Sequence, residues 1–159
     1  MQSSTTQDRP SIPISRHYNA SPEKVWRAWT DPQALARWFG PEDEGVVSLA
    51  ELDVRVGGRY HIRFGVPGGE EHNVSGVYQK VVPKQKLVFS WAWESTPERV
   101  SRVSGRLRPL GVGVNAGTEL IFVHEQFYDQ AARDAHHRGW AGTFAKLDRF
   151  LEIHEPMKH

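Results

Sequence analysis

A long run of alternating apolar and polar residues, followed by one long helical stripe, leaves few folds open to this chain. Between Val46 and Phe127 apolar residues recur at every second position, as at Tyr60, Ile62 and Phe64. This period of two predicts strands that bury one face. The connections are short and rich in glycine and proline, which favours antiparallel pairing because parallel strands need long crossovers. With a further strand over residues 12–19, we predict one antiparallel sheet of six or seven strands.

Two short helices are predicted between the first strand and the others. Ser21 is a typical N-cap, and the proline and glutamate after it suit the first helical turn. Residues 31–39 repeat this start signal with Asp31 and end at a Gly-Pro pair. The apolar residues expected on these two helices are Val25, Trp26, Trp29, Leu35, Trp38 and Phe39.

The C-terminal helix is expected from Asp129 to Ile153, which is about 35 Å at the rise of an α-helix. Its apolar residues step by four, three and four positions and share one face: Trp140, Phe144, Leu147 and Leu151, with His136 one turn earlier. No other predicted element is large enough to cover the sheet. We therefore predict an α+β fold, in which a curved antiparallel sheet wraps around one long helix and the two short helices close one end.

The length and charge of the chain indicate one folded unit. A chain of 159 residues suits a single domain, which we place at residues 12–154. Residues 1–11 are polar and are expected to form a disordered tail, with a C-terminal tail at 155–159. Basic and acidic residues number 20 and 19, and the basic ones are scattered, so neither nucleic acid nor a membrane is expected as a partner. The cytoplasm is expected, because cysteine, a membrane span and a signal-peptide core are missing from the sequence.

Several motifs in a fixed order carry a family resemblance. They are residues 20–32 (ASPEKVWRAWTDP), 38–41 (WFGP), 53–60 (DVRVGGRY), 76–78 (GVY), 82–83 (VP), 87–91 (LVFSW), 117–120 (GTEL), His124 and 139–140 (GW). The chain resembles the Hsp90 ATPase activator homologue (AHSA1-like) family of the START/Bet v 1-like (SRPBCC) helix-grip superfamily. The resemblance implies the helix-grip fold and a cavity between the sheet and the C-terminal helix. The eukaryotic activator engages its chaperone through an additional domain for which this chain has no room, so an Hsp90-type chaperone is not expected as a partner.

One helix cannot easily fill a wide concave sheet, so we expect a hydrophobic cavity beside it. Large aromatic rings line cavities well, and their polar tips can orient a ligand. The alternative for each residue is ordinary core packing. The expected ligand-binding residues are Trp38, Phe39, Tyr60, Ile62, Phe64, Tyr78, Phe89, Trp91, Trp93, Phe122, His124, Trp140 and Phe144.

His124 is the best polar candidate, because it continues the inward register of Leu120 and Phe122. It could hydrogen-bond a ligand or act as an acid or base; alternatively it caps the strand end or bonds the C-terminal helix. We expect no metal site, because His136 and His137 are adjacent and point about 100° apart on a helix. The sequence contains no nucleophile elbow and no cysteine, and we expect no cofactor.

Three hypotheses about function remain at this point. The first is binding of a small apolar or aromatic molecule in the cavity. The second is an aromatase/cyclase-like or hydrolase-like enzyme that uses His124, although no second converging polar group can be placed from the sequence. The third is a protein-interaction module, either a chaperone cofactor or a homodimer partner, which exposure of Trp26 or Trp29 would favour.

Overall fold

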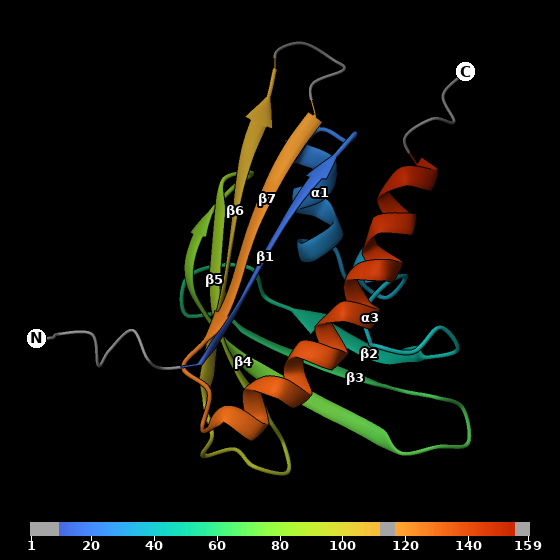
Figure 1. The fold of residues 1–159 in the computed structure, drawn as a ribbon, viewed down its shortest axis with the longest axis vertical. Coiled ribbons are helices and arrows are strands. Elements are labelled where there is room, and N and C mark those ends of the chain that lie inside the picture. Colours follow the sequence, from blue (N-terminus) through green and yellow to red (C-terminus); the bar gives the residue numbers. More distant parts are fainter. Residues whose placement is uncertain (1–9, 112–116, 155–159) are drawn as a thin grey trace, which may run out of the picture.

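The computed structural model describes residues 10–111 and 117–154. Its seven strands form one antiparallel sheet in the order β1-β7-β6-β5-β4-β3-β2. The strands are β1 (Ser11–Tyr18), β2 (Val46–Leu52), β3 (Arg59–Gly65), β4 (Glu71–Val82), β5 (Lys86–Trp93), β6 (Ser101–Leu110) and β7 (Gly117–Glu125). The helices are α1 (Pro22–Thr30), α2 (Pro32–Leu35) and α3 (Gln130–His154). Figure 1 shows α3 lying across the sheet, with α1 near one end, so the expected helix-grip fold is confirmed.

The predicted tails lie almost wholly outside the described residues. Residues 1–9 and 155–159 are not described, and β1 begins at Ser11, the last residue of the predicted N-terminal tail. None of the helices in the described part of the chain has the length and apolarity to cross a membrane.

Side-chain caps start the two short helices as expected. The hydroxyl of Ser21 accepts a hydrogen bond from the Lys24 amide at 3.2 Å, and the Asp31 carboxylate accepts one from the Gln33 amide at 3.0 Å. The second helix is shorter than predicted, because α2 ends at Leu35 and the residues up to Phe39 form turns. Gly40 then takes a φ of +105° and redirects the chain toward β2.

The sheet bends strongly between its two halves. In Figure 1, β2, β3 and β4 run across the direction of β1, β7 and β6. The pairing of β4 with β5 shifts between Tyr78 and Lys80, and such a bulge increases local bending. Gly76 allows the two strands to approach closely, since a Cβ there would lie only 2.0 Å from the carbonyl oxygen of Ser90. The bend gives the sheet the concave face on which α3 lies.

A side-chain cap starts α3, and polar contacts then fix the helix to β1. The Asp129 carboxylate accepts a hydrogen bond from the Ala132 amide at 2.8 Å, just before the first turn. Further along, Asp148 forms an ion pair with Arg16 at 3.2 Å and accepts a hydrogen bond from the Tyr18 hydroxyl at 2.7 Å. Burial is the main reason that the pKa of Tyr18 is raised, so this phenol stays protonated and donates.

A second set of contacts ties α3 to the segment between α2 and β2. A Cβ at Gly142 would lie 2.2 Å from the carbonyl oxygen of Pro41, so the helix and this segment touch through backbone. One turn later the Lys146 ammonium donates to the carbonyl oxygens of Glu42 at 2.8 Å and of Phe39 at 3.4 Å. The helix is thus held along both of its long sides.

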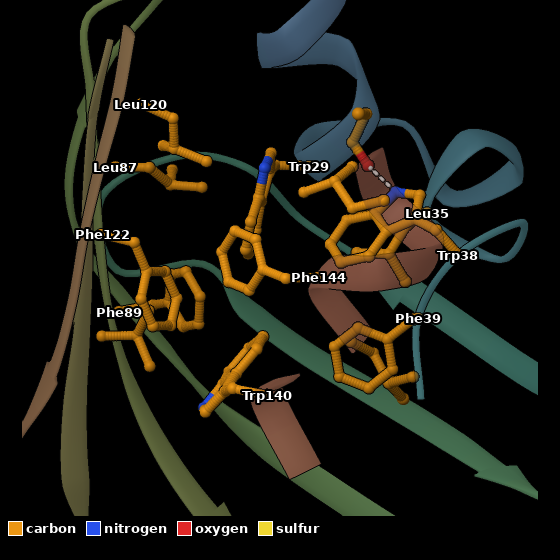
Figure 2. Close-up of a cluster of buried hydrophobic side chains, with 14 of the residues drawn as sticks. Trp29, Leu35, Trp38, Phe39, Leu87, Phe89, Leu120, Phe122, Trp140 and Phe144 are labelled. Carbon is orange, nitrogen blue, oxygen red and sulfur yellow. Dashed lines mark hydrogen bonds between the residues drawn. The ribbon is translucent and has the colours of Figure 1, made fainter. Parts of the chain in front are cut away.

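The core consists of aromatic rings packed under α1 and α2. Trp38, Phe122 and Phe144 are at most 1% exposed, and Figure 2 shows them beside the ring of Trp29. The indole of Trp38 donates to the carbonyl oxygen of Ala28 at 3.0 Å, which is the dashed bond of Figure 2. The indole nitrogen of Trp29 is buried and has no hydrogen-bond partner among the described residues.

Candidate functional site

A cavity of about 370 Å³ lies between the sheet and the first half of α3. Four segments enclose it: the turn after α2, the hairpin of β3 and β4, the end of β5, and α3. It reaches the surface, because several of its charged lining residues are exposed. Its lining residues are Phe39, Gly40, Pro41, Phe64, Glu70, Glu71, His72, Asn73, Trp91, Trp93, Glu94, Ser95, Ala135, His136, Gly139, Trp140 and Thr143.

The walls of this cavity are a connected set of aromatic rings. Trp91 packs edge-to-face against Trp93, with ring centroids 5.5 Å apart, and lies 5.2 Å from Trp140. Phe39 meets Phe64 edge-to-face at 5.2 Å, and this pair joins the tryptophans through Phe39–Trp91 at 6.2 Å and Phe64–Trp93 at 6.0 Å. Each ring is therefore held by at least one neighbour, in the geometries that aromatic quadrupoles favour.

His136 on α3 holds two of these tryptophans. Its Nδ1 lies 2.7 Å from the carbonyl oxygen of Ala132, so Nδ1 carries the proton and Nε2 is the acceptor. Nε2 accepts from the indole of Trp93 at 2.9 Å and from that of Trp91 at 3.3 Å. Burial lowers the pKa of His136, and the Ala132 carbonyl only partly offsets this. Protonation of Nε2 would remove the acceptor that both indoles share.

His124 on β7 lies behind the wall rather than on the cavity surface. It is 0% exposed, and its Nδ1 accepts a hydrogen bond from the indole of Trp140 at 2.9 Å. Its Nε2 therefore carries the proton and donates to the hydroxyl of Ser101 at 2.7 Å, which in turn bonds the Trp91 carbonyl at 3.3 Å. Burial, with a smaller contribution from His136, holds the pKa of His124 well below its ordinary value.

This arrangement determines what the two histidines can do chemically. An imidazole acts as a base only through a free lone pair. The free lone pair of His124, on Nδ1, accepts the hydrogen bond from Trp140. The Ser101 hydroxyl accepts from the Nε2–H of His124, so the imidazole does not act as a base that would activate this serine as a nucleophile. In His136 the lone pair is shared by two indoles. Both imidazoles therefore orient tryptophan rings in this structure.

The structure brings together some of the residues that the sequence marked and separates others. Phe39, Phe64, Trp91, Trp93 and Trp140 line the main cavity. A neighbouring void of about 20 Å³ is lined by four more, namely Tyr60, Ile62, Tyr78 and Phe89. Phe122 lines another void of about 20 Å³, under α1, where Trp26 and Trp29 also lie. Trp38 and Phe144 are packed in the core, and Trp29 is only 8% exposed.

His136 and the polar rim of the cavity are lining residues that were not among those predicted to contact a ligand. The available signal for His136 was its place one turn before Trp140 on the helical stripe. The rim residues Glu70, Glu71 and Glu94 lie in or beside turns, where a polar residue carries no positional signal. His61 on β3 bonds Asn73 at 2.8 Å, and both line a second hollow.

That second hollow, of about 420 Å³, is polar. Besides the residues just named, it is lined by Glu51, Arg59, Tyr60, Ser75 and Glu94. Tyr60 is the one large ring among these lining residues, so the second hollow offers an apolar guest little surface to bury. Within the described residues no cluster of three or more metal-ligating side chains occurs. The aromatic cavity is therefore the candidate site.

The chain was compared with known proteins by sequence and by structure. No curated protein matches its sequence significantly. Among solved structures, protein CV1439 from Chromobacterium violaceum is 29% identical, with a TM-score of 0.78 over 92% of this chain and 99% of that one. The AHSA1 protein SPO3351 from Silicibacter pomeroyi is 25% identical, with a TM-score of 0.77 over 91% and 99%. CalU16 from Micromonospora echinospora is 29% identical, with a TM-score of 0.62 over 89% and 75%.

The sequence family is shown by a match across most of the chain. Residues 19–152 match the family model described as Activator of Hsp90 ATPase homolog 1-like protein. This range begins directly after β1 and ends in the last turn of α3. It therefore includes every segment that encloses the cavity. The resemblance read from the motifs is thereby confirmed, and the chain belongs to the Activator of Hsp90 ATPase homolog 1-like protein family.

Proposed function

We propose that this chain binds one small apolar or aromatic molecule in the cavity between the sheet and α3. The observation that carries the proposal is a hollow of about 370 Å³ whose walls are tryptophan and phenylalanine rings. Small-molecule sites commonly have about 300–1,000 Å³ and a predominantly apolar lining. The family's fold commonly binds hydrophobic ligands, which is consistent with this assignment.

The burial of such a molecule is large enough to give useful affinity. A ligand that buries about 300 Å² of apolar surface gains a gross ~7 kcal/mol, from which the cost of association is subtracted. That cost is reduced here, because His136 and His124 already fix the rings of Trp91, Trp93 and Trp140. A pre-arranged wall loses little side-chain entropy when the ligand arrives.

The alternative of an enzyme using His124 gains no support from the site. A catalytic imidazole must come within hydrogen-bond reach of the reacting group. Two rings separate His124 from the cavity. Trp91 and Trp140 both line the cavity, and their ring centroids lie 5.2 Å and 6.1 Å from that of His124. Ligand binding therefore explains the arrangement of the site with fewer additional assumptions.

A variant that fills the cavity tests the proposal. Gly139 lines the hollow on α3, and a Cβ placed there meets nothing within 4 Å, so the side chain of Gly139→Leu starts in open space. We expect the neutral fluorophore N-phenyl-1-naphthylamine to bind the natural chain with enhanced emission. Gly139→Leu should weaken this binding at least tenfold, since the side chain takes the place of the probe.

Ala141→Leu is the matched control, because Ala141 is exposed on the same helix and does not line the cavity. It should leave probe affinity unchanged. If Gly139→Leu and the natural chain bind the probe with equal affinity, the probe binds outside this cavity, which would contradict the proposal. Failure of every compound in a broad apolar panel to bind or to raise the melting temperature would also contradict it.

A further inference from the structure

The charged residues at the mouth of the cavity all have the same sign. Glu70, Glu71 and Glu94 line it, whereas no lysine or arginine does among the described residues. Glu70 and Glu71 lie at the start of β4, and Glu94 follows β5 directly. The Glu94 amide bonds the carbonyl oxygen of Asn73 at 2.9 Å, so the two strand ends hold the rim together.

These carboxylates are not neutralised by neighbouring side chains. Among residues 10–111 and 117–154, none of the three forms an ion pair. Their charges are therefore available to a guest. His72 is the remaining ionisable side chain of the rim, and its ring packs at 5.5 Å from Phe64 and at 6.3 Å from Trp93.

Two basic side chains, Lys146 and Arg63, do not line the cavity but bond residues that do. Lys146 donates its ammonium to the backbone carbonyl oxygens of Phe39 and Glu42. On β3, Arg59 lines the second hollow, and the Arg63 guanidinium bonds the Asn73 side chain at 3.3 Å. A guest carboxylate or sulfonate would thus meet carboxylates at the mouth and find no cation among the lining residues.

The interior of the cavity favours the same kind of guest. The indole N–H groups of Trp91, Trp93 and Trp140 all donate to histidines, so these three donors are not available to a ligand acceptor. The faces of aromatic rings are negative and attract cations. An ammonium group at the mouth would meet the glutamates while its aromatic body stacked on the walls.

We infer that the natural ligand of this cavity is an apolar aromatic molecule that carries an amine, and that Glu70, Glu71 and Glu94 select against anions. The inference rests on the proposed ligand-binding function and names the chemical class of the ligand. Because the rim carboxylates are exposed, each contributes modestly and salt screens it. Together with the aromatic faces, they should give a preference on the order of tenfold for an amine over an acid of the same shape.

Three naphthalene derivatives of nearly equal size separate charge from shape. 1-Naphthalenemethylamine is cationic at pH 7, 1-naphthalenemethanol is neutral and 1-naphthoate is anionic. Competition with N-phenyl-1-naphthylamine should rank the amine about tenfold ahead of the acid, with the alcohol between them. Glu71→Gln/Glu94→Gln should reduce this ratio to about threefold or less, and salt at 0.5 M should reduce it in the natural chain.

Glu23→Gln/Glu152→Gln removes the same number of charges away from the cavity lining and should keep the full preference. If the alcohol binds but the amine binds no better than the acid, the inference about ligand class is wrong while the cavity function stands. If the preference survives Glu71→Gln/Glu94→Gln, the rim does not select charge and the inference is also overturned. If none of the three compounds binds, the failure lies in the proposed function itself.

Discussion

The two ends of the interior use the same residue types and reach opposite outcomes. Under α1 and α2 the tryptophan and phenylalanine rings leave voids of only about 20 Å³. Beside the first half of α3 they surround about 370 Å³. The short helices and the turn after α2 cover the first end and supply Trp29 and Trp38 to it, whereas at the second end only α3 and the Phe39–Pro41 segment face the bent sheet. Coverage by a second layer, rather than the apolar character of the residues, decides whether rings pack or line a cavity.

The indole groups follow the same division. In the packed end Trp38 bonds a backbone carbonyl of α1, and Trp29 has no partner among the described residues. In the open end Trp91, Trp93 and Trp140 bond histidine side chains. A tryptophan that lines a cavity cannot rely on tight packing on every side, so a hydrogen bond to a fixed imidazole sets its orientation.

The largest expected contrast comes from removing one tryptophan at each end. Trp38→Ala in the packed end should cost about 3–5 kcal/mol in the free energy of unfolding, because it opens a cavity in a filled core. Trp93→Ala in the open end should cost about 1 kcal/mol, since this ring is only half-buried and already borders a hollow. Urea unfolding followed by far-UV circular dichroism measures both. Similar losses for the two variants would show that both ends are equally packed and would remove the basis of the comparison.

Two glycines on α3 sharpen the comparison with a single added methyl group. Gly142→Ala should cost about 1–3 kcal/mol, because the Cβ would press on the Pro41 carbonyl and displace the helix. Gly139→Ala should instead stabilise by about 0.5–1 kcal/mol, since its Cβ meets open space and alanine favours helix. The melting temperatures of the two variants, compared with that of the natural chain, show directly whether each substitution stabilises or destabilises the fold. Stabilisation by both substitutions would mean that α3 is not seated on this segment.

The smallest effect is the response of the two histidines to pH. Both have pKa values lowered by burial, so the unfolded chain binds protons that the folded chain does not. Stability should therefore be fully present above the ordinary histidine pKa of about 6.5 and be lost as pH falls below it. For His124 the slope should approach about 1 kcal/mol per pH unit. His124→Asn should flatten the profile between pH 7 and 5, whereas an unchanged slope would assign the effect to other groups.

Much of the fold could be predicted because its causes are local. Capping by Ser21 and Asp31, the alternation through Tyr60 and Phe64, and the stripe from Trp140 all follow from neighbouring residues. The end of α2 at Leu35 could not be predicted in this way, since the spacing up to Phe39 fits a helix and Gly40 redirects the chain.

The composition of the site was harder to predict, because it depends on the distance between a strand and α3. The inward parity of Tyr78 and Phe89 is clear in the sequence, yet these rings pack around a small void away from the mouth. The alternation of residues along a strand predicts which face of the sheet a side chain occupies, but it does not predict how far that side chain lies from α3. His136 and the rim glutamates enter the site through the bend of the sheet, which no local pattern encodes.

The close seating of Gly142 on Pro41 has a consequence for how a guest reaches the interior. Backbone contact at Gly142 and the grip of Lys146 on two carbonyls join α3 to the Phe39–Pro41 segment, so these two walls move together. Glu70 and Glu71, where the chain enters β4, line the cavity and are exposed. The cavity is therefore open to solvent beside these two glutamates.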